Sequence, residues 1–267
     1  MSDLTAAATV RPEDPEGRRL LDADVIELLR LVRGADSVEL KVTVPSTARR
    51  STVTALGIDP LDAQIRQVYF FDTPDLALNR AGVVARARRV QGKGDDSVVK
   101  LRPVDPADLD EKLRASPEFG VEVDVMPGGY VCSASMKASL PKAPVRSTLL
   151  EGKSIKKLFS KDQRTFFEAH APSGVGLEDL AVLGPIFVLK VRIVPEGFDQ
   201  RIVGELWLYP DGSQIVELST KCPPADALTV GTATRDFLAS KGVDLAAPQQ
   251  TKTKTALEFF VNELKPA

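Results

Sequence analysis

Residues 68–90 read VYFFDTPDLALNRAGVVARARRV, and the fold prediction starts from this stretch. Val68 to Phe71 is a short apolar and aromatic run, which is typical of a β-strand. Asp72 to Asp75 (DTPD) favours a turn, because aspartate can bond its own backbone and proline fixes φ. Beyond this turn, Arg86 and Arg88 stand two residues apart in a second strand-like run. Side chains at i and i+2 of a strand share a face, so we expect both arginines to point the same way.

Other strand-like segments repeat this spacing of charge. Lys100 and Arg102 lie two residues apart in segment 97–104, and Lys190 and Arg192 do so further along the chain. Like charges on one strand face repel and lose hydration, so neighbouring strands of this kind favour a face that holds an anion. The alternative is a solvated outer face with apolar residues turned inward, and these pairs alone do not decide between the two.

Length, composition and charge indicate an ordinary globular protein. The chain has 267 residues, of which 43% are hydrophobic and 27% charged. Its net charge of −2 provides no basic field that would predict nucleic-acid binding. We find no apolar run of about 18 residues that would span a membrane and no signal-peptide pattern. Cys132 and Cys222 are interpreted as free thiols of a cytoplasmic protein. The single histidine, His170, excludes sites built from several imidazoles.

One domain is expected over residues 18–267, preceded by a disordered tail at 1–17 that is small, polar and contains proline. The predicted strands are 37–44, 68–71, 83–88, 97–104, 119–125, 186–194, 201–209 and 214–221. The predicted helices are 22–33, 47–56, 105–115, 148–170, 225–240 and 253–264. Segment 130–140 is ambiguous between strand and helix.

Six of the eight predicted strands gather charge on a single face. The pairs are Glu39/Lys41, Arg86/Arg88, Lys100/Arg102, Glu122/Asp124, Lys190/Arg192 and Glu217/Lys221, and Glu205 adds one acid. An open sheet would expose this face to water, whereas a closed barrel would turn it into a polar lumen. Carboxylates suit hard ions such as Mg²⁺ or Mn²⁺, and lysine and arginine suit phosphate oxygens. Phosphoryl transfer needs this combination, and any phosphate site here would not be a P-loop, because the sequence has no Walker-type motif.

Several of these segments resemble the CYTH, or triphosphate tunnel metalloenzyme, superfamily. Glu39-Leu40-Lys41 resembles the end of its E-x-E-x-K signature, residues 69–88 are similar to its YFDT…L…G…LRIR segment, and Val99 to Arg102 resembles its K-x-R strand. The likeness is strongest over 36–103 and extends weakly to about 221. It implies an α+β fold in which an eight-stranded antiparallel β-barrel with flanking helices binds a triphosphate compound and a divalent metal ion.

The resemblance also implies roles for individual residues. The expected catalytic residues are Glu39, Lys41 and Glu217. The expected phosphate contacts are Lys41, Arg86, Arg88, Lys100, Arg102, Lys190 and Arg192. The expected metal ligands, for Mg²⁺ or Mn²⁺, are Glu39, Glu122, Asp124, Glu205 and Glu217.

Two positions depart from the family pattern. Ser37 stands where the family has its first glutamate, and Ser219 stands where the last strand has a second one. Each change removes a carboxylate from the metal set. The remaining acids suffice for one ion, because Mg²⁺ keeps several waters, whereas a second ion has less support.

These observations predict a metal-dependent hydrolase of a triphosphate, whether inorganic triphosphate, thiamine triphosphate or a nucleoside triphosphate. Ser37 and Ser219 leave open a module that binds polyphosphate or a nucleotide without turnover. A class IV-type adenylyl cyclase is the other alternative, in which Trp207 or Tyr209 would stack on adenine, although aromatic residues on a strand are more often core.

The remaining expectations concern partners and the end of the chain. The expected partner is a triphosphate-containing small molecule, with no nucleic acid and no membrane, and a homodimer stays open. Residues 251–254 (TKTK) are interpreted as the solvated start of the last helix, although a lysine there could reach a tunnel mouth.

Overall fold

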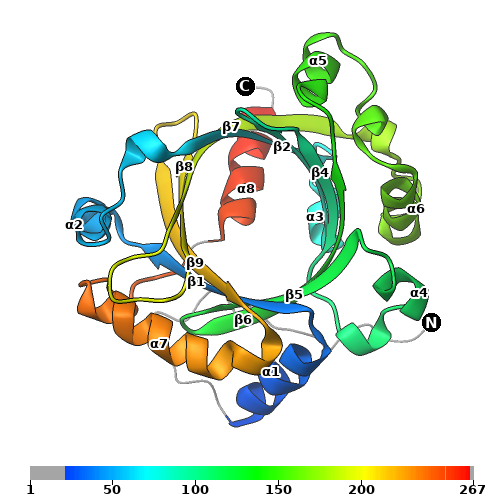
Figure 1. Ribbon diagram of the computed structural model, residues 1–267. Coiled ribbons are helices and arrows are strands. Elements are labelled where there is room, and N and C mark those ends of the chain that lie inside the picture. Colours follow the sequence, from blue (N-terminus) through cyan, green and yellow to red (C-terminus); the bar gives the residue numbers. More distant parts are fainter. Residues whose placement is uncertain (1–21, 250, 265–267) are drawn as a thin grey trace.

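Nine strands form a closed barrel in the computed structural model, which describes residues 22–249 and 251–264. The strands are β1 (Ser37–Val44), β2 (Gln64–Asp72), β3 (Val83–Val90), β4 (Asp96–Leu101), β5 (Phe119–Met126), β6 (Gly129–Ser139), β7 (Ala181–Ile193), β8 (Ile202–Leu208) and β9 (Gln214–Cys222). Around the barrel they follow the order β1-β5-β6-β4-β3-β2-β7-β8-β9, and β9 pairs with β1 to close it (Figure 1). The tail expected at 1–17 lies outside the described residues.

The barrel differs from the expected one in strand number and in one pairing. It has nine strands instead of eight, and β1 pairs in parallel with β5, whereas the other described pairs are antiparallel. The additional strand is β6, the segment that the sequence left ambiguous. Its residues from Tyr130 to Met136 are buried on both faces, so it lacks the alternation that marks a half-buried strand. β5 and β6 form a hairpin that turns at Pro127-Gly128.

Figure 1 shows α1, α2, α4, α5, α6 and α7 around the outside of the barrel. The helices of the described chain are α1 (Asp22–Gly34), α2 (Arg49–Ala55), α3 (Ala77–Arg80), α4 (Glu111–Arg114), α5 (Pro144–Leu150), α6 (Lys161–His170), α7 (Ala227–Ser240) and α8 (Lys252–Leu264). The prediction of a single helix over 148–170 is wrong, because α5 and α6 are separate helices. Gly152 adopts a φ of +59° after α5, and the Ser160 hydroxyl begins α6 by a capping box with Gln163.

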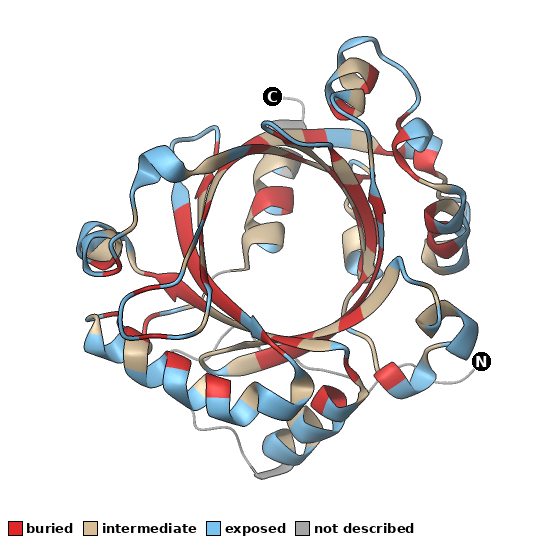
Figure 2. Ribbon diagram, in the orientation of Figure 1, coloured by how far each residue is buried: buried red, intermediate tan, exposed pale blue. Residues whose placement is uncertain are grey.

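Alternate residues of the strands divide between the tunnel and the outer core, as predicted. In β1, Glu39 and Lys41 line the tunnel, whereas Val38 and Val42 pack outward in cores that include residues of α1 and α7. On β3 and β4, Val83, Ala85, Ala87 and Val99 pack with residues of α5 and α6. Figure 2 shows buried residues along the barrel wall and exposed ones on the outer helix faces. The arrangement excludes the alternative in which the charged faces lie in bulk solvent around an apolar centre.

The predicted DTPD turn is confirmed and leads from β2 to α3. The Asp72 carboxylate accepts hydrogen bonds from the backbone N–H groups of Thr73 (2.7 Å), Leu78 (2.9 Å) and Asn79 (3.0 Å). One buried side chain thereby satisfies donors that the start of a short helix leaves unpaired. The turn fixes the approach to β3, which carries Arg86 and Arg88.

The last helix, α8, closes one end of the barrel and is visible through the opening in Figure 1. Its Ala256 and Leu257 are buried in one cluster with Val68, Phe70 and Trp207. Residues 251–254 line the tunnel cavity. The last helix starts at Lys252, as expected, and Lys254 is exposed. Lys252 follows the alternative instead, because its side chain is only 15% exposed and reaches the tunnel. Among the described residues, no helix combines the length and apolar character needed to cross a bilayer. Cys132 and Cys222 are free thiols, as expected, and both are buried.

Candidate active site

The barrel encloses a charged cavity of about 330 Å³. The predicted site residues in its lining are Glu39, Lys41, Arg86, Arg88, Lys100, Arg102, Glu122, Lys190, Glu205 and Glu217. Asp124 belongs to the same region through its ion pair with Lys41, although its side chain is fully buried. Arg192 is exposed and does not belong to the lining. The structure therefore brings all of the predicted site residues except Arg192 to one enclosed space.

Three carboxylates gather where β1 and β5 run side by side. The parallel register places Glu39 opposite Asp124 and Ser37 opposite Glu122. Ligand oxygens of Glu39, Glu122 and Asp124 all lie within 4.8 Å of one another. The strand neighbouring Ser37 therefore supplies acids close to the position where the family pattern has a glutamate and this chain has a serine.

Cations surround these carboxylates. The Lys41 ammonium lies 2.9 Å from Asp124 and 3.1 Å from Glu39, and Arg102 lies 3.5 Å from Asp124. Burial alone would raise the pKa of Asp124, but Lys41, Lys100 and Arg102 outweigh it and hold that pKa well below its usual range. Carboxylate oxygens at this spacing are donors that a hard divalent ion prefers, so the residues present fit such an ion.

Cations from β3 and β4 also belong to the lining, and most of them lack a close carboxylate partner among the described residues: Lys100 lies 4.0 Å from Asp124. Burial, followed by the charge of Arg88, lowers the pKa of Arg86 to about 10. The Nε atom of Arg86 is buried without a hydrogen-bond partner in the described part of the chain. Burial also lowers the pKa of Lys100 to about 8 despite nearby Asp124. Arg88 is the exception, because its guanidinium makes two bonds to Asp96, of 2.8 and 2.9 Å. This wall is therefore electrostatically suited to an added anion.

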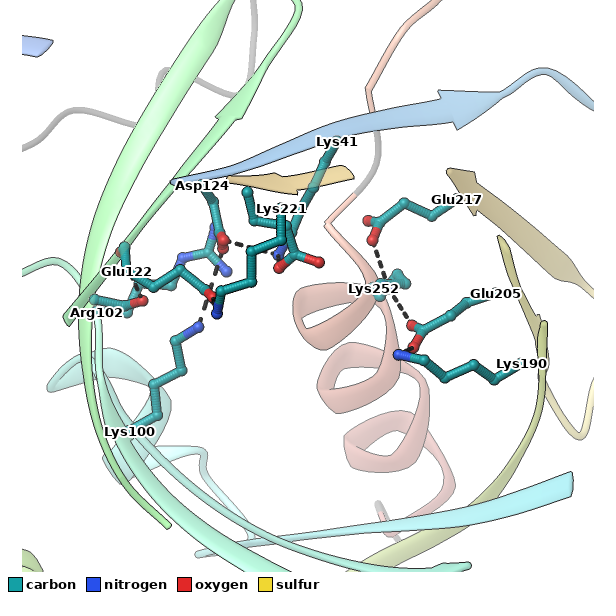
Figure 3. Close-up of polar contacts among 12 residues, drawn as sticks. Lys41, Lys100, Arg102, Glu122, Asp124, Lys190, Glu205, Glu217, Lys221 and Lys252 are labelled. Carbon is teal, nitrogen blue, oxygen red and sulfur yellow. Dashed lines mark hydrogen bonds and ion pairs between the residues drawn. The ribbon is translucent and has the colours of Figure 1, made fainter. Parts of the chain in front are cut away.

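Two further acids form a separate group with lysines from β7 and α8. Glu205 lies 2.7 Å from Lys190, and the Lys252 ammonium lies 2.6 Å from both Glu205 and Glu217. Figure 3 shows this group apart from the one around Asp124. The five expected metal ligands are thus divided, with Glu39, Glu122 and Asp124 together and Glu205 and Glu217 paired with lysines.

Among the lining residues that sequence reasoning did not assign to the site are the cations Arg66 and Lys252. Arg66 precedes Val68 by two residues and shares its face, but the predicted strand began at Val68, so this cation was left out. Burial, followed by Arg88, lowers its pKa to about 10. Lys252 lies in the TKTK run, where nothing in the sequence shows that α8 turns back into the barrel. A strand prediction extended to Gln64 would have found Arg66, whereas Lys252 required the tertiary structure.

Solved structures share this fold at low sequence identity. A proposed adenylate cyclase from Bacillus halodurans has a TM-score of 0.56 and 14% identity, over 82% of this chain and 98% of that one. HpAC1 from Hippeastrum, a proposed adenylyl cyclase with a dominant triphosphatase activity, has a TM-score of 0.61 and 15% identity, over 83% of this chain and 95% of that one. No family model and no curated protein matches the sequence.

This chain has the fold of those two proteins. The shared fold agrees with the barrel that the resemblance in the sequence motifs implies. Both alignments span most of each chain.

Proposed function

We propose that this protein is a CYTH-type hydrolase that binds a triphosphate compound in its tunnel together with one divalent metal ion. The observation that carries the proposal is the enclosed wall of cations beside three clustered carboxylates. Arg86 and Lys100 are half-buried and have lowered pKa values, which means that burial disfavours their charged forms more than the nearby carboxylates favour them. A polyanion inserted beside them supplies the missing charge, and each guanidinium offers several donors to phosphate oxygens.

The clustered acids define where the divalent ion belongs. Glu39, Glu122 and Asp124 would hold Mg²⁺ or Mn²⁺, because they offer three carboxylates within 4.8 Å of one another. When bound, such an ion neutralises charge on phosphate oxygens and orients a water molecule for attack on phosphorus. Lys41 connects the two functions, since its ammonium contacts two of these acids and also lines the cavity. It is therefore placed to contact a phosphate next to the acids.

The contacts of Trp207 and Tyr209 favour hydrolysis over cyclisation of a nucleotide. The Trp207 indole donates to Glu205 (3.1 Å) and lies under the Lys252 ammonium. The Tyr209 hydroxyl donates to the Lys252 carbonyl (3.1 Å). Both rings that the sequence offered for stacking adenine are thus buried and engaged with other parts of the chain. The enclosed, charged cavity suits the triphosphate group better than an aromatic base.

Phosphate release tests the proposal. The protein is incubated with tripolyphosphate, thiamine triphosphate and ATP, each with Mg²⁺ or Mn²⁺, and the products are assayed for orthophosphate and cyclic AMP. We expect metal-dependent orthophosphate release that Glu39→Gln lowers at least about 100-fold. Glu118→Gln is the matched control, because Glu118 is exposed before β5, and it should retain the wild-type rate.

Three results would contradict the proposal. Release that is equal in wild type and Glu39→Gln would show that the clustered carboxylates take no part. Tight binding of tripolyphosphate without any release would assign the tunnel to a binding module, and cyclic AMP as the main product from ATP would assign it to a cyclase.

A further inference from the structure

Two acids face each other across neighbouring strands at the end of the tunnel that α8 closes. Glu205 on β8 is directly opposite Glu217 on β9, and both side chains line the cavity. Like charges in this relation repel, so the fold needs a cation between them. The described structure supplies that cation as the Lys252 ammonium, whose Nζ lies 2.6 Å from Glu205 Oε2 and 2.6 Å from Glu217 Oε1 (Figure 3).

The position of Lys252 is fixed by its surroundings on α8. Its side chain is only 15% exposed and its ammonium lies 5.1 Å from the centre of the Trp207 ring. The Tyr209 hydroxyl bonds its carbonyl, and Ala256, one turn further along the helix, is fully buried. The ammonium is therefore a built-in part of the tunnel and not a mobile surface charge.

The oxygens of Glu205 are also committed to other donors. Glu205 accepts from the Lys190 ammonium (2.7 Å) and the Trp207 indole (3.1 Å) in addition to Lys252. Ser219, two residues beyond Glu217 on β9, adds no carboxylate that could complete a metal site. The pair thus has the charge and spacing of a cation site, but a lysine occupies it.

We propose that the Lys252 ammonium takes the place of a second divalent cation between Glu205 and Glu217, so that the tunnel has room for one divalent ion and not two. The inference rests on the proposed function only for the first ion, at Glu39, Glu122 and Asp124. Removal of the Lys252 ammonium should therefore create an additional divalent-cation site between Glu205 and Glu217.

Binding of Mn²⁺ tests this directly. Free Mn²⁺ is measured by electron paramagnetic resonance while Mn²⁺ alone is added to wild type, Lys252→Met and Lys252→Arg. We expect Lys252→Met to bind one more ion per chain than wild type, and Lys252→Arg to bind the same number as wild type because it keeps the positive charge. Equal numbers in wild type and Lys252→Met, or two ions in wild type, would overturn the inference.

The single tryptophan gives a second readout at the site itself. Trp207 is the only tryptophan of the chain and its indole bonds Glu205, so Mn²⁺ between the two acids should quench its fluorescence. We expect strong quenching in Lys252→Met and little in wild type. Strong quenching in wild type overturns the inference even if Lys252→Met does not fold.

The outcomes separate this inference from the proposed function. A gain of one site in Lys252→Met, combined with no phosphate release by wild type, supports the role of Lys252 and refutes the hydrolase. Phosphate release by wild type with no gain of a site supports the hydrolase and refutes the role of Lys252.

Discussion

Arg86 and Lys100 are cations that the folded chain keeps in surroundings unfavourable to their charge. Burial is the main cause of the lowered pKa in each case. A lowered pKa of a basic group means that its charged form is destabilised relative to the unfolded chain. In the free protein, keeping these two side chains charged therefore costs free energy. A bound polyanion would remove that cost, because it supplies negative charge beside them. Replacing either cation by a neutral residue should therefore raise the stability of the ligand-free protein and lower its affinity for the ligand.

Replacement of Arg86 by methionine should show this opposition. We expect Arg86→Met to raise the free energy of unfolding of the ligand-free protein by about 1 kcal/mol, because a buried and poorly compensated charge is removed. The same change should lower the affinity for tripolyphosphate at least about tenfold, because a charge-assisted contact is lost. Urea unfolding and isothermal titration calorimetry measure the two effects.

Arg89→Met provides the control on the same strand. Arg89 points away from the tunnel, where its guanidinium donates to Gln67 (2.9 Å), so its replacement should leave the affinity within about twofold of wild type. An equal loss of affinity in both variants would mean that the tunnel is not the binding site.

Lys100 should give the binding a pH dependence. Its pKa of about 8 in the folded protein lies below the ordinary value of 10.5, so in this range the unfolded chain holds a proton that the folded chain has lost. The stability of the ligand-free protein should therefore rise between these pH values. Affinity for tripolyphosphate should fall over the same range, because the ammonium becomes neutral.

Calorimetry between about pH 7 and about pH 9 measures this effect, with Lys100→Arg as the control that stays charged. We expect wild type to lose about tenfold more affinity than Lys100→Arg over this range. Parallel pH profiles for the two proteins would show that Lys100 does not bind the anion in its charged form.

At the scale of elements, the parallel pairing of β1 with β5 creates the acidic cluster. The alternation of charged and apolar residues predicted the inward faces of β1, β3, β4 and β5 correctly, because a period of two depends only on the strand itself. The same alternation says nothing about which strand is the neighbour. The sequence therefore provided Glu39 and Asp124 as site residues but not their direct opposition in the register. It also left β6 unassigned, because both faces of that strand are buried.

The position of β4, which carries Lys100, depends on a buried side chain of α6. Gln163 is fully buried, and its amide donates to the carbonyls of Ser97 (3.0 Å) and Met136 (3.1 Å), while its carbonyl accepts from the Ser97 hydroxyl (2.9 Å). We expect Gln163→Met to lower the free energy of unfolding by about 2 to 4 kcal/mol, because buried groups on β4 and β6 lose their partners.

Urea unfolding measures this loss. Glu168→Gln, at an exposed position of the same helix, should change the free energy by less than about 0.5 kcal/mol. A similarly small effect of Gln163→Met would indicate that α6 does not hold β4 through this side chain.

At the scale of the whole molecule, the barrel is closed and α8 covers one of its ends. This arrangement limits the contact between the charged lining and bulk water. The charge pattern of the sequence left an open sheet and a closed barrel as alternatives, and only the family resemblance implied a closed tunnel. The sequence could not predict that α8 folds back, because the apolar contacts of Ala256 and Leu257 with β2, β7 and β8 depend on residues distant in the chain. A ligand that binds only the closed barrel should stabilise the fold as a unit.

Thermal unfolding should report this coupling. At a tripolyphosphate concentration of about one hundred times the dissociation constant, with Mg²⁺ present, ligand binding contributes about 2.7 kcal/mol. We expect the melting temperature to rise by about 5 °C in a chain of this length. The rise should shrink strongly in Arg86→Met, and an equal rise in that variant would place the ligand outside the tunnel.

A crystal structure with tripolyphosphate and Mn²⁺ tests the central claim most directly. The account predicts phosphate density inside the barrel against Arg86 and Lys100, with one Mn²⁺ held by Glu39, Glu122 and Asp124 and with Lys252 still between Glu205 and Glu217. Phosphate and metal bound only on the outer surface, with these residues unchanged around a water-filled tunnel, would contradict it.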